Sequence, residues 1–187
     1  PYSAGDDIDF GPVVTSAAKQ NILSLVQSGI DQGADLIVDG RDFSLQGYED
    51  GFFVGAHLFD RVTPEMDIYK KEIFGPVLST VRAGSYEEAI GLAMNHEYGN
   101  GTAIFTRDGD TARDFANRIN IGMVGVNVPI PVPLAYHTFG GWKKSVFGDL
   151  NQHGPDAFKF YTRTKTVTSR WPSGIKEGGE FNFKAMD

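Results

Sequence analysis

A carboxylate and an aromatic ring stand two residues apart just before a β-type run. In the stretch KKEIFGPVLST (70–80), Glu72 and Phe74 precede a Gly-Pro pair. A carboxylate at the mouth of a strand can accept two hydrogen bonds from a vicinal diol such as that of ribose, and the ring can wall the same sugar or a base. The alternative is structural: Glu72 ends a helix and pairs with a nearby lysine, while Phe74 lies in the core. The residues by themselves leave both interpretations open.

A second candidate is the glycine-rich stretch TFGGWKKSVFG (138–148). Two adjacent glycines allow the backbone to approach a ligand or another chain closely. Three aromatic residues could form the rim of an apolar pocket: Phe139, Trp142 and Phe147. The alternative is a turn-rich loop that its aromatic residues hold in place.

Other chemistry finds little support in the sequence. There is no cysteine, which excludes disulfides, thiolate nucleophiles and cysteine metal ligands within these 187 residues. The four histidines are scattered and form no metal-binding motif, so we expect no metal site: His57, His96, His137 and His153. Of these, His137 lies in a Pro/Gly-rich loop and is the stronger functional candidate. The sequence also lacks a phosphate-binding P-loop and a G-x-S-x-G nucleophile elbow.

The composition is that of an ordinary globular protein. Apolar residues make up 41% and charged residues 22%, which is enough apolar material for a core. A formal net charge of −7 and a pI near 5.0 argue against partners such as nucleic acid or an anionic membrane. No apolar run approaches the roughly 18 residues of a membrane span, and the acidic start does not look like a signal peptide. We therefore expect a cytoplasmic protein.

Helical and strand patterns alternate along the chain. The predicted order is helix 15–32, buried strand 34–40, extended segment 52–62, short helix 63–72, strand 76–84, helix 85–97, strand 101–106, helix 110–120, strand 123–128 and helical turn 155–161. Thr15 or Ser16 can cap the first helix and Gly33 can end it. Ser85 and Glu88 are spaced as a capping box, and Thr63 can cap the short helix.

Strands of this length alternating with helices predict right-handed βαβ units in an α/β, doubly wound, mostly parallel sheet. Such sheets bind ligands beyond the carboxyl ends of their strands, so the loop 129–154, which follows the last of these strands, should lie on the ligand side. The Thr-rich alternating stretch 161–171 predicts one more strand, which would pair with an edge strand elsewhere, for example on another subunit. Residues 173–187 resemble a weakly ordered tail.

Several motifs resemble those of the aldehyde dehydrogenase superfamily. EIFGPV (72–77) resembles its nicotinamide-ribose motif, and FGGWKKS (139–145) resembles its Phe-Gly-Gly-x-Lys-x-Ser loop. The resemblance is collinear and covers nearly the whole chain, through the stretches DFGPVV (9–14), NHEYGNGTAIFTRD (95–108) and KTVTSRW (165–171).

One branch of the superfamily is especially similar. The stretches PIPVPLAYHTFGGWKKSVFGD (129–149) and GPDAFKFYTRTKTVTSRW (154–171) are closest to methylmalonate-semialdehyde dehydrogenases. The usual family pattern has glycine directly after the loop serine, whereas Val146 and Phe147 intervene here before Gly148. This departure supports the assignment to that branch.

The resemblance implies an NAD-dependent enzyme in which a cysteine thiolate attacks the aldehyde and hydride passes to nicotinamide, leaving a thioacyl enzyme. In this branch coenzyme A is the acyl acceptor, and CO₂ is lost when methylmalonate semialdehyde is the substrate. Malonate semialdehyde is the related substrate, and the context is valine and inositol catabolism.

The family's site residues carry over only where the sequence matches. Glu72 corresponds to the ribose-binding glutamate, Phe74 to the aromatic residue beside nicotinamide, and Phe139 to a position on the rim of the substrate pocket. In the family, the catalytic cysteine, the NAD-binding Rossmann part and the arginines that bind the substrate carboxylate all precede the DFGPVV stretch. We therefore expect no catalytic residue in these 187 residues, and we expect the chain to be inactive by itself.

The resemblance also implies a division of the chain. Residues 1–154 correspond to the carboxyl-terminal part of the catalytic domain, 155–172 to an oligomerisation strand region and 173–187 to a tail. The 161–171 strand implies a homo-oligomer, because in the family the corresponding strand joins a sheet of a neighbouring subunit. The alternative is a non-catalytic interaction module derived from a split gene or from proteolysis.

Overall fold

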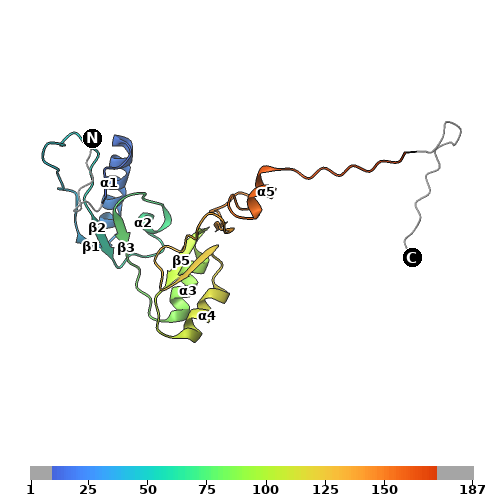
Figure 1. Ribbon diagram of the computed structural model, residues 1–187. Helices are drawn as coiled ribbons and strands as arrows, with labels where there is room; N and C mark the ends of the chain where they lie inside the picture. The colour runs from blue at the N-terminus through green and yellow to red at the C-terminus, as the bar shows by residue number, and fades with distance from the viewer. Residues whose placement is uncertain (1–9, 172–187) are drawn as a thin grey trace.

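The computed structural model describes residues 10–171, which fold into two small lobes followed by an extended segment (Figure 1). The first lobe contains α1 (Ser16–Asp31), β1 (Asp35–Val38), β2 (His57–Asp60), α2 (Asp67–Lys70) and β3 (Val77–Ser79). The second contains α3 (Tyr86–Asn95), β4 (Tyr98–Gly99), β5 (Gly101–Ile104), α4 (Gly109–Arg118), β6 (Met123–Val126) and β7 (Trp142–Lys143), and α5 (Asp156–Tyr161) follows. Each lobe has its own cluster of buried apolar side chains.

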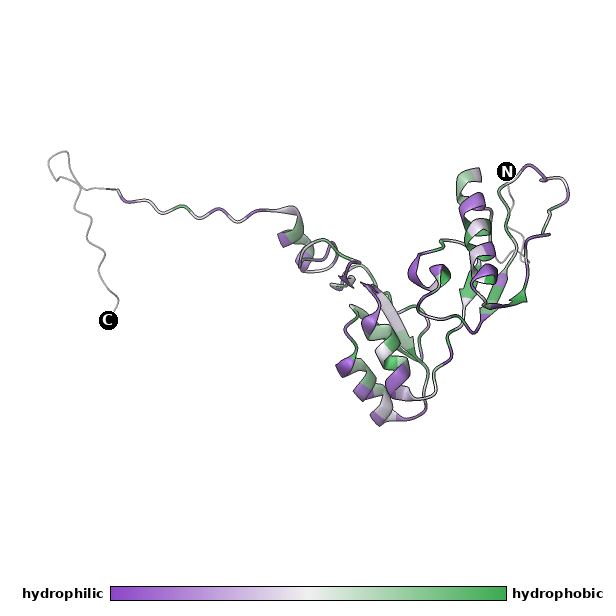
Figure 2. Ribbon diagram, turned by 180° about the vertical axis from the view of Figure 1, so that it is seen from behind, coloured by the Kyte–Doolittle hydropathy of each residue, from purple (hydrophilic) through white to green (hydrophobic). Residues whose placement is uncertain are grey.

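Helix α1 forms as the sequence predicts. The Thr15 side chain accepts a hydrogen bond from the backbone N–H of Ala18 at 3.1 Å, so Thr15 rather than Ser16 is the N-cap. Ile22 and Val26 on one face are fully buried and belong to the same core as Phe59 of β2. Figure 2 shows hydrophobic and hydrophilic residues alternating along this helix, as one buried face requires. Gly33 follows the helix with a φ of +94°, the left-handed stop expected from its type.

The first sheet has the order β1-β2-β3 and mixed direction. β2 and β3 are parallel, whereas β1 and β2 are antiparallel. The prediction of a buried strand at 34–40 was wrong about burial, because β1 lies at the edge of this sheet and Ile37 is 59% exposed. An edge strand has a neighbour on one side only, so fewer of its side chains are covered.

The second lobe contains the βαβ unit that the alternating pattern predicted. β5 and β6 are parallel neighbours, joined through α4. Ile90 of α3 and Phe115 of α4 are buried together in the core of this lobe. The Ser85 side chain caps α3 by accepting from the N–H of Glu88 at 3.2 Å, and the Glu88 carboxylate accepts from the N–H of Gly84 rather than that of Ser85.

Residues 10–171 do not form a single doubly wound sheet. The strands divide into three small sheets, of which β2–β3 and β5–β6 are parallel pairs and β4–β7 is antiparallel. No ladder joins the strands of the first lobe to β5 or β6 in the described part of the chain, so both lobes keep unpaired strand edges. The mixed α/β character is as predicted.

The short helix was predicted to start too early. Residues 63–66 form a turn, closed by a bond from the Met66 N–H to the Thr63 carbonyl at 3.1 Å, and α2 begins only at Asp67. Met66 is the N-cap and has an extended backbone with a ψ of 147°, which prevents the turn and α2 from forming one helix. The Thr63 side chain therefore does not cap α2.

The segment after α5 is extended and has no strand neighbour within the described chain. Residues 162–171 are exposed throughout and take part in no sheet within the described chain, so the predicted pairing of a 161–171 strand with another subunit stays a prediction. Figure 1 shows the segment running away from both lobes, so no strand edge of this chain lies beside it. A strand needs a partner for its backbone groups.

Some expectations are not tested by the fold. The boundaries at 154 and 172 stay predictions, and the tail at 173–187 lies outside the described residues, as do residues 1–9. Among residues 10–171, no helix has the length and apolar character needed to cross a membrane.

Candidate cofactor and substrate site

Glu72 lies just after α2 and presents an exposed carboxylate. The structural interpretation required it to pair with a lysine, but both neighbouring lysines have other partners. Lys70 Nζ donates to the carbonyl of Glu65 at 2.6 Å, and Lys71 Nζ lies 3.1 Å from the Asp67 carboxylate. No hydrogen bond or ion pair of the Glu72 side chain occurs within residues 10–171, so its carboxylate oxygens can accept hydrogen bonds from a ligand.

Phe74 is not a core residue either, since 80% of it is exposed. Its φ of +55° places a bulky residue in the left-handed region, where surrounding contacts must hold it. Gly75 provides one such contact, because a Cβ there would lie 2.5 Å from Ile22 Cδ1 on α1. This close approach anchors the motif to α1 while the ring of Phe74 points outward.

A cavity of about 430 Å³ joins Glu72 to the glycine-rich loop. Its walls come from both lobes: Tyr69, Lys70, Lys71 and Glu72 from the first, and His96, Tyr98, Asn100 and Ser145 from the second. The two sequence motifs, more than 60 residues apart, therefore each line this cavity. Phe74 does not line this cavity.

Phe139 lines an adjoining cavity of about 320 Å³. Its half-buried ring stacks on His153, with ring centres 4.7 Å apart and planes 10° from parallel. Phe147 lines the same cavity, as predicted, whereas Trp142 does not. Asn100 and Ser145 line both cavities, so the cavity lined by Phe139 (the Phe139 cavity) lies beside the cavity lined by Glu72 (the Glu72 cavity).

The two glycines of the loop serve contacts within the chain. A Cβ on Gly140 would collide with the Asn151 side chain, and a Cβ on Gly141 would lie 2.6 Å from Ser145 Cβ. The carbonyl oxygen of Gly140 in turn lies where a Cβ on Gly122 would be. Ser145 Oγ accepts a hydrogen bond from the N–H of Gly99 at 3.1 Å. The close backbone approach predicted from the two glycines is therefore present, and the backbone approaches other parts of this same chain.

These contacts correct the expected position of the loop. Gly99 and Gly122 lie just before β5 and β6, so residues 139–145 pack at the amino ends of this parallel pair. The prediction had placed the loop beyond the carboxyl ends. The chain leaves β6 at its carboxyl end and then runs back along the β5–β6 pair. Pro131 accordingly lies beside the start of β5, 3.6 Å from a Cβ placed on Gly101.

His96 lines the same cavity as Glu72, which the sequence did not predict. Its Nδ1 accepts from the N–H of Tyr98 at 3.2 Å, which leaves Nε2 as the nitrogen that donates to the Tyr69 carbonyl, also at 3.2 Å. The rings of His96 and Tyr69 meet edge to face, 5.2 Å apart. His96 thereby ties the two lobes together, a role that the sequence does not indicate because Tyr69 is distant in the chain.

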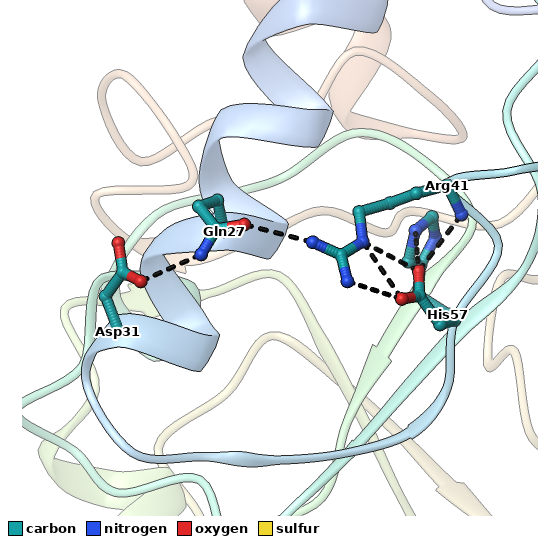
Figure 3. A network of polar contacts seen from close by, with 5 residues as sticks. Gln27, Asp31, Arg41 and His57 are labelled. Atoms are coloured by element: carbon teal, nitrogen blue, oxygen red, sulfur yellow. Dashed lines mark hydrogen bonds and ion pairs between the residues drawn. The ribbon is translucent and has the colours of Figure 1, made fainter.

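Of the other histidines, His153 lines the Phe139 cavity, whereas His57 and His137 lie elsewhere. His57 is buried, with 3% exposed, as expected of a structural residue, and its Nε2 lies 3.9 Å from the Asp39 carboxylate. Figure 3 shows Arg41 extended between His57 and Gln27 of α1, and the Arg41 side chain also pairs with Asp39. The hydrogen bond from the Arg41 side chain lowers the pKa of Asp39 from 3.8 to about 2. His137 lines neither cavity, and no group of three possible metal ligands occurs among residues 10–171.

Comparison with known proteins identifies the family. The model of the aldehyde dehydrogenase family matches residues 3–167. The chain belongs to the aldehyde dehydrogenase family. It is 58% identical over 180 residues to the malonate-semialdehyde dehydrogenase of Pseudomonas aeruginosa, covering 96% of this chain and 36% of that protein. It is 50% identical over 165 residues to the acylating mitochondrial methylmalonate-semialdehyde dehydrogenase of Arabidopsis thaliana, covering 88% and 27%.

Solved aldehyde dehydrogenase structures share the fold. A provisionally named methylmalonate-semialdehyde dehydrogenase of Sinorhizobium meliloti, complexed with NAD, is 76% identical with a TM-score of 0.83. The methylmalonate-semialdehyde dehydrogenase of Oceanimonas doudoroffii is 56% identical with a TM-score of 0.82. The matches cover 90% and 89% of this chain and 34% of each of those chains. The chain thus spans about a third of the length of these relatives.

Proposed function

We propose that this chain is the carboxyl-terminal part of an NAD-dependent, coenzyme A-acylating dehydrogenase of methylmalonate or malonate semialdehyde. The branch is supported by the similarity to enzymes of those names. In this proposal the segment supplies half of the cofactor site and one wall of the aldehyde pocket. The catalytic cysteine belongs to a part of the enzyme outside these 187 residues, which contain no cysteine.

The exposed, unpaired carboxylate of Glu72 is the observation that carries the proposal. A carboxylate with free lone pairs at a cavity wall can accept two hydrogen bonds from the hydroxyls of the nicotinamide ribose. Lys70 and Lys71 line the same cavity, yet their ammonium groups are held by Glu65 and Asp67. Glu72 therefore does not have to give up an ion pair before it binds a sugar.

Phe74 and Phe139 complete the proposed arrangement. The exposed ring of Phe74, two residues from Glu72, would pack beside the nicotinamide, and Phe139 would shape the rim of the pocket for the aldehyde. Bound NAD would supply the hydride acceptor. The residues of this chain orient the cofactor and the aldehyde, which raises the rate by holding the reacting groups close together.

Glu72→Gln in the full-length enzyme tests the cofactor site. Glutamine keeps the shape but replaces one acceptor oxygen with a donor, so we expect the Michaelis constant for NAD to rise about tenfold. Steady-state kinetics with NAD varied at saturating aldehyde measure this. Glu49→Gln is the matched control, since it makes the same substitution at an exposed carboxylate that lines neither the Glu72 cavity nor the Phe139 cavity. Unchanged kinetics in the Glu72→Gln enzyme would return Glu72 to a structural role.

The isolated 187-residue chain distinguishes the two functions under consideration. With semialdehyde, NAD and coenzyme A added, we expect no NADH, because no residue here can replace a thiolate nucleophile. Robust NADH formation would contradict the proposal. A non-catalytic interaction module remains the second candidate, motivated by the exposed segment 162–171. The intact mass of the source protein separates them: a parent chain more than twice this length favours the enzyme.

A further inference from the structure

Lys143 of β7 supplies the positive charge that α3 lacks at its carboxyl end. Its Nζ donates to the carbonyl oxygens of Met94 at 2.8 Å and His96 at 2.9 Å, and it lies 3.4 Å from that of Ala93. The last turn of α3 has no basic residue of its own. Because the final carbonyls of a helix lack intrahelical partners and carry its negative dipole end, a cation there is stabilising.

The backbone around Lys143 is attached to the same region. In the β4–β7 pair, Tyr98 lies opposite Lys143 and Gly99 opposite Trp142. The stem of Lys143 lies over Gly99, since a Cβ there would be 3.2 Å from Lys143 Cδ. The φ of Lys143 is +53°, an unfavourable value for a side-chain-bearing residue that only surrounding contacts can maintain. The conformation of the loop thus depends on what Lys143 binds.

Lys143 belongs to the loop whose residues line both the Glu72 cavity and the Phe139 cavity. Ser145, two residues later, lines the Glu72 cavity and the Phe139 cavity alike, and Phe139 lies four residues earlier. Glu72 is attached to the other lobe and makes no contact with β7 through a hydrogen bond or ion pair in the described chain. The lysine lines neither of these two cavities.

We propose that Lys143 is a positioning residue that holds the Phe-Gly-Gly loop, and with it the aldehyde pocket, in place relative to Glu72. The inference rests on the proposed function. Without the ammonium group the loop loses its attachment to the end of α3 and is held less precisely, whereas Glu72 keeps its own support on α2 and β3. Loss of Lys143 should therefore weaken aldehyde binding more than NAD binding.

The test compares Lys143→Met with Lys144→Met in the full-length enzyme that contains this segment. For Lys143→Met we expect the Michaelis constant for the semialdehyde to rise about tenfold, as the loss of charge-assisted hydrogen bonds implies, and the dissociation constant for NAD to change less than about twofold. The latter is measured separately, by fluorescence titration. Lys144 is a matched control, because it is 66% exposed and its ammonium group meets Glu97 at the surface. We expect its kinetics to match those of the unmodified enzyme.

The outcomes separate positioning from mere stabilisation. A purely structural role lowers the melting temperature and the fraction of active enzyme but leaves the aldehyde Michaelis constant of the surviving molecules unchanged, and that result overturns the proposal. If Lys143→Met does not fold, Lys143→Gln replaces it, since glutamine keeps two N–H donors on a shorter side chain. It should raise the same constant about threefold. An unchanged constant overturns the proposal here too.

Failure of the proposed function looks different. An unmodified enzyme that forms no NADH from the semialdehyde removes both the proposed function and this inference. An active enzyme whose aldehyde Michaelis constant is insensitive to Lys143→Met removes the inference alone.

Discussion

Glu72 and Phe74 both differ from the structural interpretation of their motif, which expected an ion pair for the first and a core position for the second. Glu72 follows two lysines, and an ion pair would be the ordinary outcome, yet each lysine is held by another oxygen. Phe74 is apolar, yet its backbone turns its ring outward. An exposed carboxylate with free lone pairs next to an exposed ring has the groups that the proposed contact with a sugar and an aromatic base requires.

Asp39 should make the stability of the first lobe depend on pH in the acid range. The Arg41 side chain lowers the pKa of Asp39 from 3.8 to about 2 in the folded state. Because the folded pKa is depressed, the stabilisation is fully present above pH 3.8 and is lost as the pH falls through about 2. Melting temperatures of the wild type and Asp39→Asn, measured from pH 7 downward, should converge over this interval. A constant difference would contradict the prediction.

Elements are held together by close backbone approaches that single glycines allow. β6 begins next to Gly122, against which the carbonyl of Gly140 packs, and this contact places the Phe-Gly-Gly loop at the amino ends of β5 and β6. Asn127, just after β6, extends the pairing with its side chain. Its Oδ1 accepts from the Thr106 N–H at 2.9 Å, and its Nδ2 donates to the Thr106 carbonyl at 3.0 Å.

Gly122→Ala should destabilise the second lobe, because its methyl group would meet the Gly140 carbonyl. We expect a loss of about 2 kcal/mol in the free energy of unfolding, as for other overpacked sites, measured by urea denaturation of the 187-residue chain.

Gly91→Ala is the matched control. Gly91 lies within α3 with no atom within 4 Å of a Cβ placed on it, so alanine should stabilise the helix by up to about 1 kcal/mol. If Gly122→Ala and Gly91→Ala changed the free energy of unfolding by the same amount, the prediction that the contact with Gly140 excludes a methyl group would be wrong.

The molecule as a whole leaves much apolar surface and several strand edges open. Large apolar side chains are exposed on both lobes and beyond: Phe74, Phe105, Ile130, Leu134, Phe147 and Phe158. Exposed patches of this kind and unpaired edges favour association with other protein surfaces. Within the proposed enzyme, the rest of the chain and neighbouring subunits would cover them.

The 187-residue chain should therefore oligomerise. We expect light scattering to give a mass above that of a monomer, and we expect removal of residues 162–187 to reduce it, because the exposed segment 162–169 belongs to no sheet of the described chain and can add a strand to a neighbouring sheet. A well-behaved monomer at low concentration would contradict the first expectation. An unchanged mass after the deletion would contradict the second.

The sequence by itself determined what depends on local interactions and on motif order. Thr15, Gly33 and Ser85 mark helix ends because caps and left-handed stops involve residues only a few positions apart. The collinear motifs were sufficient to indicate the family, which the matches to known proteins bear out.

Only the tertiary structure decided how those parts meet. Which residues share a cavity with Glu72, where the Phe-Gly-Gly loop packs, and which helix Lys143 caps all depend on contacts between residues tens of positions apart. Strand burial at β1 and pairing of 161–171 likewise depend on which neighbours are present, and no pattern within a strand specifies its neighbour. The periodicity of a segment shows which face is apolar; only the fold shows what covers that face.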